Sequence, residues 1–256
     1  KIKKQLPDNN LQILSHNHCN SAVTTSCDVN GEILIFREEE WFKVLIHETF
    51  HSLCLDFSTM PSYIKSEFNK EIRSIMPVKS SYNLFESYSE FWACVWNCAF
   101  CSYHLGENTF KTFVAYFDFC IQTEILFSIF QMNKVLKFMG LQYELLYDKK
   151  ESNLSTARNY LYREKTNVFA YYIMKTVLLY HHVEFMEWCD IHNGLSLIQF
   201  RNTKLNLMDF AKFIKEKYND SDMIGVIKLI RDINEQDSNE IETYKTLRMS
   251  VCELEE

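Results

Sequence analysis

The sequence predicts an α+β fold that is predominantly α, with a small N-terminal β-sheet followed by a helical body. Only five glycines and three prolines interrupt the 256 residues, and long segments repeat apolar residues with the i, i+3, i+4 spacing of helices. The exception comes early, where the β-prone runs SAVTTSC and EILIFR are separated by DVNG. The Asn30-Gly31 pair in DVNG is typical of hairpin turns, so we expect a small sheet before the first long helix.

The expected helices follow from the apolar spacing and from the prolines between them. The first begins near residues 37–39, where successive glutamates favour the positive end of the helix dipole, and runs to about residue 57. Pro61 limits this helix, and Pro77 with SSYN forms a loop after the second. The other segments expected to be helical are 62–75, 84–105, 110–139, 167–189, 207–218 and 222–233.

The length and composition predict a single domain over residues 1–256. A chain with 47% hydrophobic content at this length is able to bury one sizeable core. A sub-division is the alternative, in which residues 1–150 hold the sheet and the active-site helices and residues 151–256 form a C-terminal helical part. The polar segment NLSTARN at 153–159 would then be the loop between the two parts.

The charge and hydropathy patterns exclude two classes of partner. A net charge of -7 is spread over mixed acidic and basic segments, so no long basic patch is present to bind a phosphate backbone. The longest uncharged stretch, residues 91–106, is too short and too polar to span a bilayer, and no secretory signal opens the sequence. We therefore expect neither nucleic acid nor a membrane as a partner.

The nine cysteines indicate a reduced protein. Their number is odd, and Cys94, Cys98 and Cys101 fall on one helix face, where free cysteine packs as a small hydrophobic residue. We interpret the chain as intracellular (cytoplasmic). Its phenylalanine-, tyrosine-, asparagine- and lysine-rich composition is typical of AT-rich genomes, so large DNA viruses and some protists are sources that fit. In the viral case we expect a virion-associated protein.

The candidate chemistry begins with HETFH at residues 47–51. On a helix, His47 and His51 are one turn apart on the same face, so their imidazoles are able to share a zinc ion. Glu48 is then placed to act as the general base toward a zinc-activated water. The flanking residues are apolar enough to bury the helix, and a buried polar triplet of this kind needs partners.

A catalytic zinc usually takes three protein ligands and leaves the fourth position to water, so another element must supply the third ligand. The expected helix 84–105 begins with FESYSE, in which Glu86 and Glu90 are four residues apart on one face. Two carboxylates that face a core are costly unless they are paired or bind a metal. Either glutamate is able to supply the third ligand by this spacing.

The HExxH motif followed by this glutamate helix resembles the gluzincin metallopeptidases, the thermolysin-like families, over about residues 21–100. The resemblance implies a zincin-like domain in which His47, His51 and Glu86 bind Zn²⁺ and Glu48 is the base. It implies that Glu90 accepts a hydrogen bond from a ligand imidazole, although the family often has aspartate there. It also implies that an edge strand, here EILIF, borders the cleft and holds an extended peptide.

Two other zinc classes fit the residues less well. A metzincin needs HExxHxxGxxH, but Cys54 replaces the glycine and Phe57 replaces the third histidine. An aspzincin would use an aspartate, and Asp56 is available. On a continuing helix Asp56 would point away from the two histidines, so we interpret it as a hydrogen-bonding residue at the helix end.

Peptide hydrolysis also benefits from a donor that stabilises the oxyanion. The candidates are Tyr171, Tyr172, His181, His182 and Arg248, each of which has an ordinary structural interpretation as well. We select Tyr172. Arg248, in an otherwise uncharged segment, indicates a specific carboxylate partner.

The expected function is a zinc-dependent metallopeptidase that hydrolyses peptide bonds of a peptide or protein substrate through a zinc-activated water, with Glu48 as the general base. The first alternative is a catalytically inactive zincin-like scaffold or assembly protein. The second is a helical interaction protein without metal. Retention of Glu48 within HExxH favours the enzyme over the scaffold.

Overall fold

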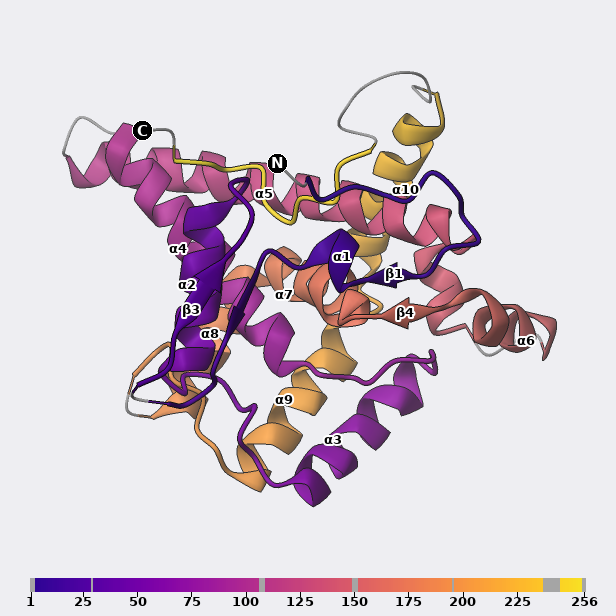
Figure 1. Ribbon diagram of the computed structural model, residues 1–256, viewed down its shortest axis with the longest axis horizontal. Helices are drawn as coiled ribbons and strands as arrows, with labels where there is room; N and C mark the ends of the chain where they lie inside the picture. Colours follow the sequence, from indigo (N-terminus) through magenta and orange to yellow (C-terminus); the bar gives the residue numbers. More distant parts are fainter. Residues whose placement is uncertain are drawn as a thin grey trace.

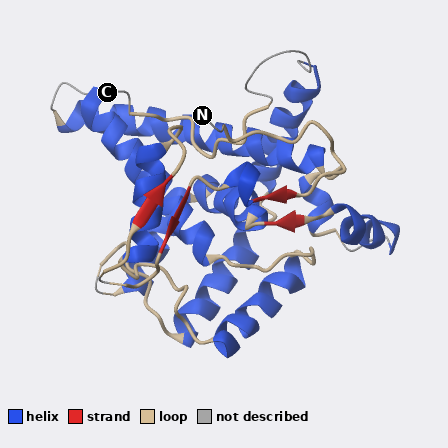
Figure 2. Cartoon of the chain, in the orientation of Figure 1, coloured by secondary structure: helices blue, strands red, loops and turns tan. Residues whose placement is uncertain are grey.

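The computed structural model describes residues 3–28, 30–105, 109–148, 152–194, 196–236 and 245–254. It is predominantly helical, with two small two-stranded sheets on one side of a helical body (Figures 1 and 2). This confirms the α+β class with most residues in helices. The helices are α1 (His16–Cys19), α2 (Trp41–Ser52), α3 (Ser62–Ile75), α4 (Phe85–Leu105), α5 (Phe110–Phe138), η1 (Tyr143–Leu146), α6 (Ser152–Leu161), η2 (Phe169–Met174), α7 (Lys175–Tyr180), α8 (His182–Asn193), α9 (Lys204–Lys217) and α10 (Ser221–Gln236).

The first sheet is the expected hairpin. Strands β2 (Ala22–Thr24) and β3 (Ile33–Ile35) pair antiparallel, with Ala22 opposite Ile35 and Thr24 opposite Ile33. Its connection contains a turn in which the Gly31 amide donates to the Asp28 carbonyl at 2.9 Å. The second sheet joins β1 (Leu14–Ser15) to β4 (Glu164–Lys165) in parallel and was not expected, because two-residue strands carry no alternating pattern.

Helix α2 ends earlier than expected, at Ser52 rather than near residue 57. Cys54 adopts a left-handed conformation with φ 55°, which turns the chain back toward the helix. A disulfide links Cys54 to Cys27, and the other seven cysteines are free. The interpretation of a fully reduced chain is therefore wrong at this pair, and the intracellular location stays a prediction.

The C-terminal half departs from the expected elements in two places. The segment 153–159, expected as a loop, lies inside helix α6. The expected helix 167–189 is divided into a π-helical turn, η2, and the helices α7 and α8, with a break at His181. The apolar core continues across residue 150, as the Phe91 and Phe185 rings show at a centroid distance of 4.8 Å.

Helix α5 runs along one side of the body, packed against α4 and α10 (Figure 1). It is long and apolar enough to cross a membrane by length and composition alone, which a core helix also satisfies. The expectation of no membrane partner stays a prediction. The two terminal segments lie side by side over α5, where the Leu247 amide donates to the Lys4 carbonyl at 2.9 Å.

Candidate metal centre

Three side chains from two helices converge at the centre of the HExxH helix. His47 and His51 come from α2 and Glu86 from the first turn of α4. The two Nε2 atoms are 3.0 Å apart, and Glu86 Oε2 lies 3.3 Å from His47 Nε2 and 3.2 Å from His51 Nε2. In a tetrahedral site with metal–ligand bonds of about 2.0–2.1 Å, neighbouring ligand atoms are roughly 3.3 Å apart. This nearly equilateral triangle therefore has the size of one face of such a site.

The opposite ring nitrogen of each histidine meets a buried carboxylate. Glu90 Oε2 lies 2.9 Å from His47 Nδ1, a close contact that is not aligned as an ideal hydrogen bond. Asp56 Oδ2 contacts His51 Nδ1. Metal-binding histidines commonly have a carboxylate in this position, because it fixes the ring and raises the basicity of the ligand nitrogen. Glu86 therefore lies on the side to which both Nε2 atoms point, and Glu90 lies behind His47.

Asp56 is a hydrogen-bonding residue just after the end of α2, as the sequence indicated, but its partner was not predicted. It was interpreted as a hydrogen-bonding residue at the helix end, and the structure assigns its hydrogen bond to a ligand imidazole. The chain reversal at Cys54 brings it back to His51, and the Ser58 amide donates to its other oxygen at 2.6 Å. Helical periodicity could not reveal this position, because the helix ends four residues before it.

The charges of the three ligands depend on one another. Burial opposes ionisation of Glu86, but its contacts with His47 and His51 lower its pKa to about 2. Burial likewise opposes protonation of His51, whereas Asp56 and Glu86 raise its pKa to about 10. A metal ion would therefore compete with protons for the same ring nitrogens.

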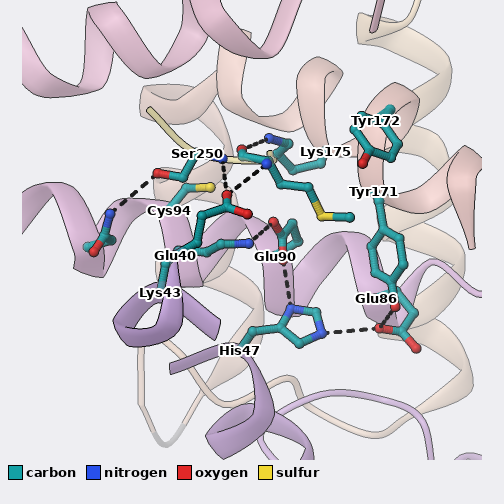
Figure 3. A network of polar contacts seen from close by, with 12 residues as sticks. Glu40, Lys43, His47, Glu86, Glu90, Cys94, Tyr171, Tyr172, Lys175 and Ser250 are labelled. Carbon is teal, nitrogen blue, oxygen red and sulfur yellow. Dashed lines mark hydrogen bonds and ion pairs between the residues drawn. The ribbon is translucent and has the colours of Figure 1, made fainter. Parts of the chain in front are cut away.

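A buried ion pair lies behind the centre, and the sequence did not indicate it. Lys43, one turn before His47 on α2, donates to Glu90 Oε1. Figure 3 shows Glu90 between the Lys43 ammonium and the His47 ring. Burial opposes ionisation of Glu90, but Lys43 together with His47 lowers its pKa well below the ordinary value. Glu90 is thereby held as a carboxylate against the imidazole.

The network continues from Lys43 toward the two ends of the described chain. Glu40, just before α2, interacts with Lys43 electrostatically and accepts a hydrogen bond from Lys4 Nζ at 2.9 Å. It also accepts from the backbone amides of Met249 and Ser250 (Figure 3). Buried charges of this kind persist because each has a partner, so both terminal segments are held against the back of the centre.

Glu48 faces a cavity of about 200 Å³ that the two ligand histidines also line. Glu48 is only 8% exposed, and this burial raises the pKa of its carboxyl group. The wall opposite includes Ala22, Val23 and Thr24 of β2. The lining of this cavity includes β2 and no residue of β3, so β2 rather than the expected EILIF strand borders it.

The tyrosine selected as the oxyanion donor lies elsewhere. The Tyr172 hydroxyl is buried and donates to the Leu247 carbonyl at 2.6 Å. Its neighbour Tyr171 lines the cavity and donates to Glu86 Oε2 at 3.1 Å (Figure 3). Both tyrosines lie in the π-helical turn at residues 169–174, and it is Tyr171 rather than Tyr172 that lines the cavity.

The remaining donor candidates are engaged away from the centre. His181 Nδ1 lies 3.7 Å from Glu184, and His182 Nδ1 is hydrogen-bonded with the Leu179 carbonyl at 3.2 Å. Arg248 pairs with Glu253 at 2.7 Å, which is the carboxylate partner expected from its sequence context. Asn167, which the sequence did not single out, donates to Glu86 Oε1 at 3.0 Å and fixes the ligand carboxylate.

No family model, curated protein or solved structure matches this chain. The possible metal-binding group of His47, His51 and Glu86 therefore rests on the residues themselves and on the geometry above.

Proposed function

We propose that the protein is a zinc-dependent metallopeptidase of gluzincin type with a zincin-like arrangement of its site. The single observation that supports this proposal best is the triangle of two Nε2 atoms and Glu86 Oε2, with Glu90 and Asp56 on the outer ring nitrogens. Structural ion pairs seldom orient two imidazoles toward a common point while supplying each with its own carboxylate.

Zinc suits this donor set better than the common hard cations do. Two neutral imidazoles and one carboxylate are typical of catalytic zinc, whereas calcium and magnesium prefer oxygen ligands throughout. Three protein ligands leave a fourth position, and the adjoining cavity provides space for a substrate carbonyl. When bound, zinc would activate a water and polarise that carbonyl.

The chain's own residues supply the proton transfer and the positioning. Glu48 is adjacent to His47 on α2, and its raised pKa suits a carboxylate that accepts a proton and later returns it to the leaving amine. The Tyr171 hydroxyl is placed to donate a hydrogen bond to developing negative charge on the substrate oxygen. Strand β2 would bind an extended peptide through its backbone, because its residues form the cavity wall.

Metal analysis of the purified protein and of two glutamate variants tests the ligand assignment. We expect zinc at the centre in the wild-type protein, loss of that zinc in Glu86→Ala and retention in Glu90→Ala with weaker binding. The reverse pattern, with zinc lost only when Glu90 is removed, would contradict the assignment of Glu86. A chain that never binds metal at this centre would favour a helical interaction protein.

Peptide cleavage tests the activity separately from the metal. A broad library of unstructured peptides is incubated with the wild-type protein and with Glu48→Gln. We expect cleavage that is abolished in the variant while zinc is retained, because the isosteric amide cannot accept the proton. Zinc binding without cleavage of any peptide would favour an inactive scaffold.

A further inference from the structure

A second group of metal-ligating side chains lies outside the candidate metal centre. Ligand atoms of Cys98, Glu124 and Cys252 are all within 4.8 Å of one another. Cys98 and Glu124 are completely buried, whereas Cys252 in the C-terminal segment is partly accessible. The three residues come from α4, α5 and the segment that covers both helices.

Two helices place cysteines and a glutamate on the faces that meet at this group. Cys94 and Cys98 are four residues apart on α4, and Cys120 and Glu124 are four residues apart on α5. Residues at i and i+4 share a helix face, and α4 packs directly on α5. Cys252 interacts with the thiols of both Cys98 and Cys120, and its Sγ lies 3.9 Å from the Cys120 carbonyl.

The two oxygens of the Glu124 carboxylate have different partners. Oε2 accepts from Ser250 Oγ at 3.0 Å, from the Val251 amide at 3.0 Å and from the Cys252 amide at 3.3 Å. Oε1 has the Cys94 thiol at 3.9 Å, and a thiol is a weak donor. A carboxylate buried in this way normally has stronger partners on both oxygens.

We propose that Cys98, Cys120, Glu124 and Cys252 bind a thiophilic divalent cation, Zn²⁺ by the chemistry of the donor set, as a structural site. Three sulfurs and one carboxylate complete a tetrahedral shell, which is typical of structural rather than catalytic zinc. With Zn–S bonds of about 2.3 Å, neighbouring sulfurs lie roughly 3.8 Å apart, so the ligand atoms of Cys98, Glu124 and Cys252 have to contract by only about 1 Å. The Cys120 thiol, which interacts with Cys252, lies outside that group of three and would have to move in to complete the shell. Each coordinating thiol releases its proton to solvent.

The charge of such a site has a compensating group. Three thiolates and one carboxylate around a divalent cation carry an excess of negative charge, which is costly in a buried position. The buried Lys175 ammonium interacts electrostatically with Glu124 and donates to the Met249 carbonyl at 2.7 Å. Its positive charge therefore lies next to the C-terminal segment at Met249.

The site would hold the C-terminal segment in place through Cys252. The same segment donates the amides of Met249 and Ser250 to Glu40, which belongs to the network behind His47 (Figure 3). A cation between Cys252 and the helices would thus fasten the segment on which that network depends. This role needs no catalytic activity and does not rest on the proposed peptidase function.

Cobalt substitution tests the site. The full-length protein is purified in the presence of a phosphine reductant, stripped with a chelator and titrated with Co²⁺. We expect two ions per chain and intense near-ultraviolet sulfur-to-cobalt charge-transfer bands. Cys252→Ser should lower the stoichiometry to one and abolish these bands, whereas His47→Ala should also lower it to one but keep them.

Controls keep the test specific. Cys189→Ser alters a buried free thiol on α8 that lies outside this group, and it should retain both ions and the bands. Circular dichroism checks that the Cys252→Ser chain is folded, and Cys120→Ser provides a second ligand variant. A single ion per chain without charge-transfer bands, bands that persist in Cys252→Ser, or a Cys98–Cys252 disulfide in place of the ion would each overturn the proposal.

Discussion

Substituting Glu90 should lower the free energy of unfolding even when no metal is bound. In Glu90→Gln the Lys43 ammonium, 2% exposed, loses the carboxylate that faces it. Removal of one partner from a buried ion pair typically costs about 3–5 kcal/mol, because an uncompensated charge remains in the interior. Glu40 continues to offset part of the Lys43 charge, so we expect a loss near the lower end, about 3 kcal/mol.

The same substitution should weaken the metal centre by a separate and smaller amount. Loss of a carboxylate behind a ligand histidine usually lowers metal affinity about 10–100-fold, which corresponds to roughly 1.4–2.7 kcal/mol. Urea unfolding in excess chelator isolates the first effect, since no ion then contributes to the free energy of unfolding. A competition titration with a chromogenic chelator measures the second.

A double-mutant cycle tests whether the loss of stability comes from the unpaired buried charge of Lys43 or from disturbed packing. Lys43→Met together with Glu90→Gln removes both charges, and replacement of a buried pair by neutral groups is often close to neutral. We expect the double variant to be about 2 kcal/mol more stable than Glu90→Gln alone in chelator. The reasoning is refuted if the two single losses simply add, because the buried lysine would then not be the source of the cost.

Three further outcomes follow from the same contacts. Asp56→Asn should lower metal affinity about 10-fold, measured by chelator competition, because an amide is a weaker acceptor for the His51 ring. Tyr171→Phe should lower kcat about 100-fold with zinc retained, because it removes the hydroxyl that lines the cavity. Tyr172→Phe should leave kcat unchanged and lower the free energy of unfolding in urea by about 1 kcal/mol, and equal effects of the two variants on kcat would contradict the assignment. The pKa of Glu86 is lowered in the folded chain, so the free energy of unfolding of the metal-free protein should fall by up to about 3 kcal/mol as pH falls from about 4.5 to about 2. Urea unfolding measures this change, and it should be smaller in Glu86→Gln, which lacks the carboxyl group.

The elements that the sequence predicted well are those whose signals are local. Helix α3 has the expected bounds, Ser62–Ile75, because Pro61 precedes it and Pro77 follows it closely. The spacing also predicted that His47 and His51 share a helix face, and the structure brings them together with Glu86 as a possible metal-binding group. Spacing alone left Glu86 and Glu90 open, and only the gluzincin resemblance favoured Glu86.

The parts that the sequence missed depend on contacts between distant segments. Asp56 reaches His51 only because Cys54 adopts a left-handed conformation, which nothing in the local sequence requires. Lys43 reads as an ordinary polar residue on an amphipathic helix, and its role becomes visible only when α4 places Glu90 against it. The hairpin was predicted correctly, but which of its strands lines the cavity is set by how the hairpin packs on α2.

Because residues 169–174 form a π-helical turn, the direction of the Tyr171 side chain depends on the number of residues in this segment. A π turn contains one residue more than an α turn, so it acts as a single-residue insertion at the start of the helical run that continues as α7. A related chain that lacked this residue would keep a continuous helix here and still retain both tyrosines in its sequence. Where the lost residue lies between Tyr171 and α7, the Tyr171 hydroxyl would rotate away from Glu86, because one residue corresponds to about 100° around an α-helix. In comparisons with related chains, the spacing within this segment should therefore be more informative than the presence of the tyrosine.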